Sequence, residues 1–236
     1  MQMKPLPPST LVKKDVWPLL GALLQLYQLK RLYRQGWLRR GVPPEACESV
    51  AEHSFMVAFL ALALGQSRAE PGLDPLKLVS MALLHDVGEV LAGDITPHDG
   101  VSPAEKEALE REGAHKLLLA MPEGHRLMDL WEQYEAQSCP EARLVKALDK
   151  LELGLQARVY EDALGLDLGE FLASARAGAE DGLLQRLLLA LEAGRTGAPT
   201  VYPSPPPRSE TEGPSHLSHP RRPPPPDPAL PAAPET

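Results

Sequence analysis

Apolar residues recur at helical spacing along most of the chain, and no stretch alternates apolar and polar residues as a half-buried strand would. A first helix is predicted over residues 18–34, with Pro18 in its first turn, where a missing amide hydrogen is tolerated. The glycines and prolines of GWLRRGVPPEA end this helix. Its apolar side carries Leu20, Leu23, Leu24 and Tyr27.

Six further helices are predicted from the same periodicity. Two of them begin with capping signals, since Ser49 is followed by Glu52 and Asp74 precedes Pro75. The chain is therefore predicted to be all-α, a compact helical bundle rather than an extended array. The predicted ranges are 49–65, 75–91, 103–121, 122–137, 141–162 and 168–194. The apolar side of the helix over 141–162 carries Leu144, Leu148, Leu151, Leu155 and Val159.

The composition changes near residue 201. Residues 201–236 hold 13 of the 26 prolines and almost no large apolar residues. Proline lacks an amide donor and fixes φ, so this segment is predicted to be a disordered, proline-rich C-terminal tail. The chain is accordingly divided into an N-terminal extension (1–17), one domain (18–200) and the tail (201–236).

Charge and cysteine content narrow the class of protein. A net charge of −8 argues against a nucleic acid polymer as the main partner, although a small phosphate ligand needs only a few local cations. Cys47 and Cys139 are too few for a disulfide framework. The longest apolar run, residues 55–65, is too short to cross a bilayer, and the first residues lack the apolar region of a signal peptide. A soluble cytoplasmic protein without a membrane partner is predicted.

The segment MALLHDVGEVLAGD, residues 81–94, places ionisable residues in an otherwise apolar helix. Burying such groups is costly unless they are paired or bind a metal, so the segment suggests a site. Glu89 is four residues after His85 and three after Asp86, and it therefore lies near both on a helix surface. A solvated polar edge late in an amphipathic helix would explain this short motif equally well.

His53 and Asp149 have ordinary explanations when each is taken alone. His53 could be a packed core histidine, and Asp149 could pair with Lys146 or Lys150 on a solvated face. Taken together, the two histidines and two aspartates would offer two neutral nitrogens and two carboxylate oxygens. That donor set suits one divalent ion, such as Mn²⁺, Co²⁺, Fe²⁺, Mg²⁺ or Zn²⁺, rather than a thiolate-seeking metal.

These four residues, His53, the pair His85-Asp86 and Asp149, resemble the H…HD…D signature of the HD-domain metal-dependent phosphohydrolases. The segments SVAEHS, LLHDVGEVLAGDI and LVKALDKLE, with YRQGWLRRGV upstream and WEQYEAQS between, resemble the 5′-deoxynucleotidase branch over roughly residues 19–162. The resemblance implies an all-α bundle, often a homodimer, that cleaves nucleoside 5′-monophosphates to nucleoside and phosphate.

Carried over residue by residue, the resemblance implies a role for each motif residue. Glu89 would orient or deprotonate the attacking water. Asp94 resembles a second carboxylate near the substrate sugar and the leaving oxygen. The implied metal ligands are His53, His85, Asp86 and Asp149.

The resemblance also implies substrate contacts. The family's phosphate- and nucleotide-contacting element corresponds to the segment with Arg34, Trp37 and Arg40, and a substrate-lining loop corresponds to the segment with Glu135. In bacterial members arginine directly precedes the tryptophan, whereas the order here is RQGW, so Arg39 and Arg40 are alternatives for the phosphate contact. A solvated helix end would also explain these arginines, and packing would also explain Trp37.

The leading prediction is a phosphomonoesterase that acts on deoxynucleoside 5′-monophosphates with one principal metal. His98, His115 and His125 lie where some family members place ligands for a second metal, and they are expected at the surface. Two alternatives stay open. One is hydrolysis of another phosphorylated or pyrophosphorylated nucleotide on the same metal centre. The other is a non-catalytic metal- or nucleotide-binding module whose tail recruits a partner.

Overall fold

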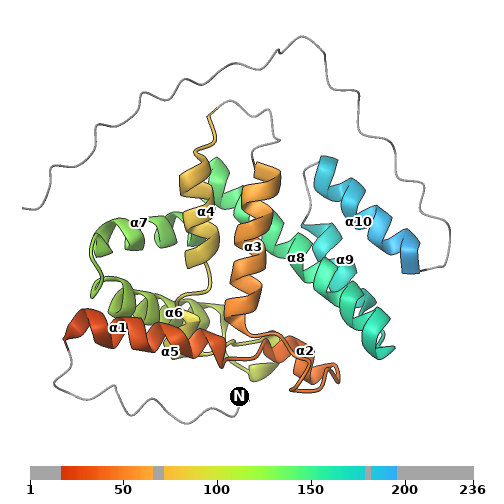
Figure 1. Ribbon diagram of the computed structural model, residues 1–236, viewed down its shortest axis with the longest axis horizontal. Coiled ribbons are helices and arrows are strands. Elements are labelled where there is room, and N and C mark those ends of the chain that lie inside the picture. The colour runs from red at the N-terminus through yellow and green to blue at the C-terminus, as the bar shows by residue number, and fades with distance from the viewer. Residues whose placement is uncertain (1–16, 66–71, 179–181, 196–236) are drawn as a thin grey trace, which may run out of the picture. The chain divides into compact units, whose positions relative to one another are not determined.

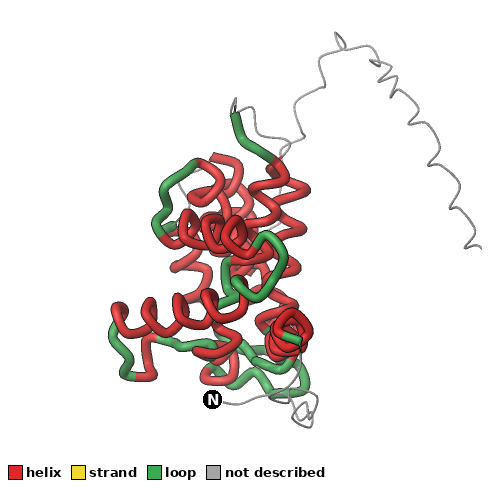
Figure 2. The backbone as a smooth tube through the Cα atoms, turned by 90° about the vertical axis from the view of Figure 1, so that its left-hand side faces the viewer, coloured by secondary structure: helices red, strands yellow, loops and turns green. Residues whose placement is uncertain are grey.

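Helices and the turns between them make up the part of the chain that the computed structural model describes, residues 17–65, 72–178 and 182–195 (Figure 1; Figure 2). An isolated antiparallel bridge joins Tyr33 to Ser49, and no strand is found in these ranges. The predicted all-α fold is confirmed. The predicted tail lies outside the described residues, as does the predicted N-terminal extension apart from Trp17. No helix in the described ranges has the length and apolar character needed to cross a membrane.

Ten α-helices and two short 3₁₀ helices are found in the described residues. The α-helices are α1 (Pro18–Leu26), α2 (Gln35–Arg39), α3 (Val50–Gly65), α4 (Pro75–Leu84), α5 (Glu89–Ala92), α6 (Pro103–Leu118), α7 (Gly124–Glu135), α8 (Pro140–Leu164), α9 (Gly169–Ala177) and α10 (Gly182–Arg195). The 3₁₀ helices are η1 (Tyr27–Lys30) and η2 (Pro97–Asp99). The helix predicted over 168–194 is divided into α9 and α10, and residues 179–181 between them lie outside the described part.

The long helix α8 lies at the centre of the packing. It contacts α3, α4, α7, α9 and α10, and it passes behind α3 in Figure 1. Most of its predicted apolar side is buried, as Leu144, Leu148 and Leu151 show, whereas Val159 near its end is exposed. Because α8 packs against both α3 and α4, it holds together the three segments that carry the predicted metal ligands.

The first helix is shorter than predicted and presents a different side to the core. Helix α1 ends at Leu26 and is followed by η1. Ala22 is buried in an apolar cluster that includes residues of α6. Helical spacing identifies an apolar side but not the side that meets a neighbour, and here the small alanine faces α6. The residues of the predicted side that are exposed instead are Leu20, Leu23 and Tyr27.

The chain after η1 is extended rather than helical, and this sets the position of Arg34. The amide of Val50 donates to the carbonyl of Leu32 (2.9 Å), and the amide of Arg34 donates to the carbonyl of Glu48 (3.2 Å). The backbone groups of Leu32 and Arg34 thus find partners in Val50, the first residue of α3, and in Glu48 before it, rather than in a continued helix. Arg34 therefore has an extended backbone and stands directly before α2.

The helix predicted over 75–91 is interrupted between α4 and α5. A Cβ on Gly88, in the interruption, would come within 2.4 Å of the carbonyl oxygen of Glu110 on α6. A Cβ on Gly113 would come within 2.3 Å of the carbonyl oxygen of Gly88. Two glycines thus allow this turn and α6 to approach at backbone distance. The turn contains His85 and Asp86, so the interruption shapes the candidate site.

Candidate metal centre

Side chains from three segments meet at one largely buried point. His53 comes from α3, His85 and Asp86 follow the last residue of α4, and Asp149 comes from α8. His53 Nε2 lies 3.3 Å from His85 Nε2 and 3.3 Å from Asp149 Oδ1. Asp86 Oδ2 lies 3.3 Å from His85 Nε2 and 3.6 Å from His53 Nε2. The structure brings together all four predicted metal ligands.

Each imidazole is held through the nitrogen that faces away from this point. His85 Nδ1 lies 2.8 Å from the carbonyl oxygen of Ala82, and His53 Nδ1 lies 2.6 Å from Glu152 Oε2. A carbonyl oxygen or an ionised carboxylate only accepts, so Nδ1 carries the hydrogen. In a neutral ring Nε2 then presents its lone pair to the other donors.

The donor set fits a divalent cation. It consists of two imidazole nitrogens and two carboxylate oxygens, which are ligands that such an ion accepts together. The ligand atoms of His53, His85 and Asp86 all lie within 4.8 Å of one another. With Asp149 they form a His/Asp cluster whose donors could hold a metal ion, here named the metal-binding cluster.

Charge pairing controls the protonation of this cluster. Burial and Arg34 both lower the pKa of His53. Hydrogen bonds to Asp149 and Glu152 outweigh them, so that the pKa of His53 is raised to about 10. Burial raises the pKa of Asp86 and of Asp149, but the adjacent imidazoles lower both values well below the ordinary range. A cation that enters the cluster must therefore displace the proton on His53.

Arg34 lies beside the cluster and contacts three carboxyl groups. Its Nη1 is 3.2 Å from Asp94 Oδ1, 3.5 Å from Asp86 Oδ2 and 3.9 Å from Glu89 Oε1. Asp94 Oδ2 also accepts a hydrogen bond from the backbone amide of Gln35, the first residue of α2. The extended segment before α2 thus delivers a guanidinium to the edge of the metal-binding cluster.

Glu89 is a buried carboxyl group with unused hydrogen-bonding capacity. It is 3% exposed, and its Oε2 has no hydrogen-bond partner among the described residues. Burial, Asp86 and Asp94 raise its pKa well above the ordinary value, although Arg34 opposes them. A carboxyl group with these properties suits proton transfer at a reacting centre.

Trp37 lies in the interior. It is 1% exposed, and its ring centroid is 5.3 Å from that of Tyr160 and 4.4 Å from that of Phe171. Its Nε1 donates to Glu48 Oε1 at 2.7 Å. The ring is enclosed by side chains, so packing accounts for its position without a stacked base.

Arg39 and Arg40 both form ion pairs away from the cluster. Arg40 Nη2 donates to Glu170 Oε2 at 2.8 Å, and Arg39 pairs with Asp99. Both line a cavity of about 680 Å³ whose lining includes none of the four predicted ligands. Of the three arginines considered for the phosphate contact, Arg34 is the one that the structure places beside the metal-binding cluster.

Glu135, the predicted residue of the substrate-lining loop, is the last residue of α7 and is half-buried. Burial raises its pKa, Lys146 opposes this shift, and the charge of Asp86 adds to it. Its carboxyl group is therefore electrostatically coupled to the metal-binding cluster.

Sequence reasoning did not single out Tyr134 and treated Lys146 only as an ordinary ion-pair partner. The ring centroid of Tyr134 lies 5.5 Å from that of His85. Lys146 Nζ lies 3.3 Å from the Tyr134 hydroxyl and 3.4 Å from Asp149 Oδ2. Since Asp149 Oδ1 faces His53, one carboxyl group serves both the ion pair and the cluster. In the sequence, the spacing of three residues between Lys146 and Asp149 is the pattern that indicates this ion pair.

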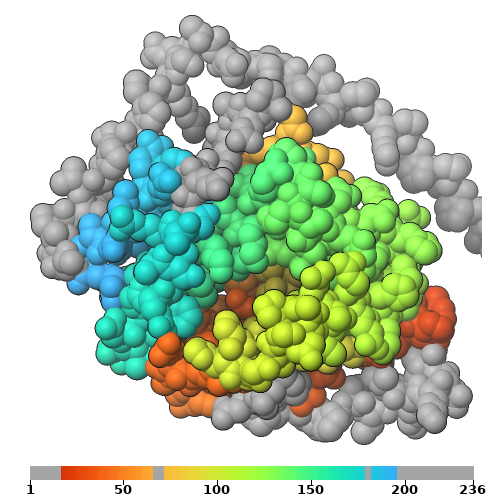
Figure 3. Space-filling model, turned by 180° about the vertical axis from the view of Figure 1, so that it is seen from behind, coloured from red at the N-terminus to blue at the C-terminus, as the bar shows by residue number. Residues whose placement is uncertain are grey.

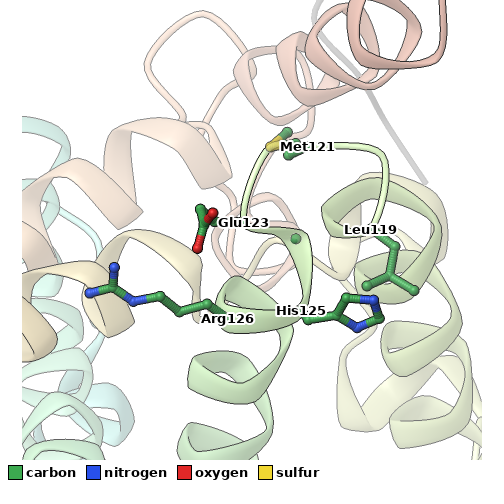
Figure 4. A pocket seen from close by; sticks show the side chains of 6 residues that line it. Leu119, Met121, Glu123, His125 and Arg126 are labelled. Carbon is green, nitrogen blue, oxygen red and sulfur yellow. The ribbon is translucent and has the colours of Figure 1, made fainter.

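The three histidines expected at the surface, His98, His115 and His125, are exposed. His125 borders a cavity of about 380 Å³ near the start of α7. In Figure 4 the side chains of His125 and Arg126 point in opposite directions. These two side chains therefore do not converge on a common ligand.

Helices that carry site residues border a hollow in the surface. Figure 3 shows this hollow between α8, in green, and the segment around α6, in yellow, with α2 in orange at one end. Asp149 is on α8, and Arg34 directly precedes α2. The side chain of Asp86 is 18% exposed, so the cluster is reachable from solvent.

The fold and the site define a class of protein. It is an all-helical domain in which a His/Asp metal-binding cluster lies beside a buried carboxyl group and an arginine, as metal-assisted hydrolysis of a phosphate ester requires. The chain belongs to the HD domain family, whose sequence pattern matches residues 26–183. The predicted family resemblance is confirmed.

Relatives with assigned activities and with solved structures are found. The chain is 37% identical over 179 residues to 5′-deoxynucleotidase HDDC2 of Dictyostelium discoideum, covering 71% of this chain and 93% of that one. It is 40% identical over 146 residues to 5′-deoxynucleotidase HDDC2 of Homo sapiens, covering 61% and 69%. A solved protein from Pyrococcus horikoshii is 33% identical with a TM-score of 0.62, covering 73% and 97%. A predicted metal-dependent phosphohydrolase from Magnetospirillum magnetotacticum is 28% identical with a TM-score of 0.57, covering 76% and 95%.

Proposed function

We propose that the protein hydrolyses deoxynucleoside 5′-monophosphates to nucleoside and phosphate. Its relatives from Dictyostelium and human are named 5′-deoxynucleotidases. The position of Arg34 carries the proposal, because its guanidinium lies 3.5 Å from Asp86 and 3.2 Å from Asp94. A phosphoryl group between the metal-binding cluster and Arg34 would meet positive charge on both sides.

One divalent ion, drawn from Mn²⁺, Co²⁺, Fe²⁺, Mg²⁺ and Zn²⁺, would be held by His53, His85, Asp86 and Asp149. When bound, the ion supplies a Lewis acid that polarises a phosphoryl oxygen and lowers the pKa of water to about 7. The two aspartates balance the charge of the dication. The imidazoles add donors without adding charge.

Arg34 binds the phosphoryl group in this proposal. Its planar guanidinium has forked donors whose geometry fits phosphoryl oxygens. Asp94, which accepts from the amide of Gln35, keeps Arg34 at the edge of the cluster and stands near the substrate sugar and the leaving oxygen. Glu135 lines the substrate site from the end of α7.

Glu89 accepts or donates the proton that is transferred during hydrolysis. Its free Oε2 accepts a hydrogen bond from the attacking water and orients that water toward phosphorus. The same carboxyl group takes the water's proton or returns one to the leaving 5′ oxygen. Burial, Asp86 and Asp94 raise the pKa of Glu89, which favours its protonated form and so the return of a proton to the leaving oxygen.

A phosphate-release screen over deoxyribonucleoside, ribonucleoside and cyclic nucleotides tests the substrate class. Release from deoxynucleoside 5′-monophosphates in the presence of a divalent ion is expected. No release from any of them would reject the proposal. If phosphate is released only from a pyrophosphorylated nucleotide, the substrate belongs to the alternative class and is hydrolysed at the same metal centre.

Paired variants separate an enzyme from a binding module. Glu89→Ala is expected to keep stoichiometric metal but to lose hydrolysis, whereas His85→Ala is expected to lose both. Full hydrolysis by Glu89→Ala would remove Glu89 from the mechanism. Stoichiometric metal in His85→Ala would remove His85 from the ligand set.

A homodimer is part of the proposal. Helix α3 carries Phe55, Phe59 and Leu62 at helical spacing, and these side chains are 62%, 54% and 49% exposed. Two copies related by a two-fold axis would cover this surface on each other. Light scattering is expected to give twice the chain mass for the wild type and less for Phe59→Glu. A monomeric wild type at micromolar concentration would reject the dimer.

We also propose one domain over residues 18–200, between an N-terminal extension (1–17) and a tail (201–236). The proposed location is the cytoplasm. A chain that ends at residue 200 is expected to keep nearly all turnover. A large loss of turnover would assign the tail a part in the site.

A further inference from the structure

Glu152 lies on the side of His53 that faces away from the metal-binding cluster. It follows Asp149 by three residues on α8, so the two side chains share a face of that helix. Asp149 Oδ1 lies 3.3 Å from His53 Nε2, and Glu152 Oε2 lies 2.6 Å from His53 Nδ1. One helix thus contacts both edges of the same imidazole ring.

The contact between His53 and Glu152 is enclosed by protein. Their side chains are 1% and 4% exposed. Glu48 stands beside them, since the ligand atoms of the three residues all lie within 4.8 Å of one another. Glu48 in turn accepts from the buried Trp37. A carboxylate removed from water is costly unless it is well paired, and His53 is the partner that Glu152 has at hydrogen-bond distance.

The geometry determines which nitrogen of His53 faces the cluster. With an ionised Glu152 as acceptor, the hydrogen of the neutral ring stays on Nδ1, and Nε2 directs its lone pair at the cluster. A carboxylate in this place also fixes the rotation of the ring and makes it a stronger donor. The corresponding acceptor for His85 is a neutral backbone carbonyl, that of Ala82.

We infer that Glu152 is a positioning residue of the metal centre, which fixes the tautomer and orientation of His53 and thereby strengthens divalent metal binding. The inference rests on the metal-dependent function proposed above. Glu152 contacts the cluster at Nδ1 of His53, on the far side of the ring from the other ligand atoms, and acts through that ring. Trp37 and Glu48 close the outer side of this arrangement, which gives the enclosed tryptophan a role remote from any base.

Titration calorimetry with Mn²⁺ on the full-length chain tests the inference. Glu152→Ala is expected to weaken Mn²⁺ binding by about 10- to 100-fold. Glu152→Gln is expected to weaken it less, because the amide oxygen still accepts from Nδ1. The matched control is Glu141→Gln, which removes a buried carboxyl group from the same helix where it contacts Lys77 and the amide of Asp74. The control is expected to bind Mn²⁺ as the wild type does.

Nitrogen NMR of the Zn²⁺-loaded protein with ¹⁵N-labelled histidine supplies a second readout. The wild type is expected to show His53 with its hydrogen on Nδ1, and Glu152→Ala is expected to shift that signal, because the hydrogen loses its acceptor. Thermal unfolding with EDTA checks that each variant folds.

Wild-type Mn²⁺ affinity and an unchanged His53 signal in both Glu152 variants would overturn the inference. An equal loss of affinity in Glu141→Gln would also overturn it, since a general loss of stability would then be the cause. A wild type that binds no Mn²⁺ would reject the metal centre and the proposed function with it. Weakened Mn²⁺ binding in the Glu152 variants, beside a wild type that releases no phosphate from nucleotides, would support the inference and reject only the substrate.

Discussion

Arg34 Nη1 lies 3.2 Å from Asp94 Oδ1, although the two residues are 60 positions apart in the sequence. The same carboxyl group accepts from the amide of Gln35 through its other oxygen. The loop that contains Asp94 therefore holds Arg34 against the metal-binding cluster. Arg34 is consequently the residue whose removal should separate phosphate binding from metal binding.

Arg34→Ala is expected to lower kcat/KM by about 10- to 100-fold, mainly through a higher KM, because a charge-assisted hydrogen bond contributes about 1.5–3 kcal/mol. The kcat/KM of Arg34→Lys should fall between those of the wild type and Arg34→Ala, since a lysine lacks the forked donors. Steady-state kinetics measures kcat and KM, and metal analysis measures the bound ion. The metal content of the variants should equal that of the wild type. Arg40→Ala is the control, because Arg40 pairs with Glu170. An equal loss in Arg40→Ala would move the phosphate contact to Arg40.

Metal affinity is expected to depend on pH. Hydrogen bonds to Asp149 and Glu152 raise the pKa of His53 to about 10 despite burial and Arg34. Metal binding must therefore release a proton, and the dissociation constant should rise by about tenfold per unit as the pH falls from 8 to 6. Calorimetry at one pH in buffers of different ionisation enthalpy counts the released protons. Binding without proton release would contradict the charge state assigned to His53.

The helices were open to prediction from sequence because each has a local signal. Capping residues and apolar spacing placed α3, α6, α7 and α8 close to their observed ends. His85 and Asp86 are unusual in an apolar helix, whereas His53 and Asp149 have ordinary explanations alone and enter the ligand set through the family signature. Their convergence follows from the packing of α8 against α3 and α4.

Other features depend on neighbours that a local pattern does not contain. Gly88, in the break between α4 and α5, lies against the backbone of α6, and the α1 surface that is buried depends on α6. Glu152 is one of several glutamates on α8, and its contact with His53 requires the fold. Trp37 looked equally suited to packing or to stacking until its enclosure was seen.

Stability should respond to pH through Glu110. Burial raises the pKa of Glu110 to about 7, with Lys106 opposing the shift and Asp86 adding to it. Because this value lies above the ordinary 4.5, the folded protein binds more protons than the unfolded chain between these pH values. The contribution of this group to stability therefore falls as the pH rises through that window.

Glu110→Gln is accordingly expected to raise the free energy of unfolding at pH 8 by on the order of 1–2 kcal/mol relative to the wild type, and much less at pH 5. Urea unfolding with EDTA at both pH values measures the difference. Glu107→Gln, at an exposed position of the same helix, is the control and should show no such pH dependence. An increase in the free energy of unfolding that is equal at pH 5 and pH 8 in Glu110→Gln would contradict the raised pKa of Glu110.

Gly88→Ala is expected to destabilise the protein by about 1–3 kcal/mol, because the new methyl group would overlap the carbonyl of Glu110. Hydrolysis should fall as well, since the displaced turn carries His85 and Asp86. Gly21→Ala is the matched control: a Cβ there meets nothing within 4 Å in helix α1, so the change should stabilise by about 0.5–1 kcal/mol. Thermal unfolding and phosphate release report both effects. Unchanged stability in Gly88→Ala would mean that the turn and α6 tolerate a wider separation.

The convergence of His53, His85, Asp86 and Asp149 on one cation is the central claim, and anomalous diffraction from crystals of the Mn²⁺-loaded protein tests it most directly. One principal peak is expected, at about 2.0–2.3 Å from both Nε2 atoms and from one oxygen of each aspartate. A peak that any of these four side chains fails to reach, or a principal peak at another place in the molecule, would contradict the account.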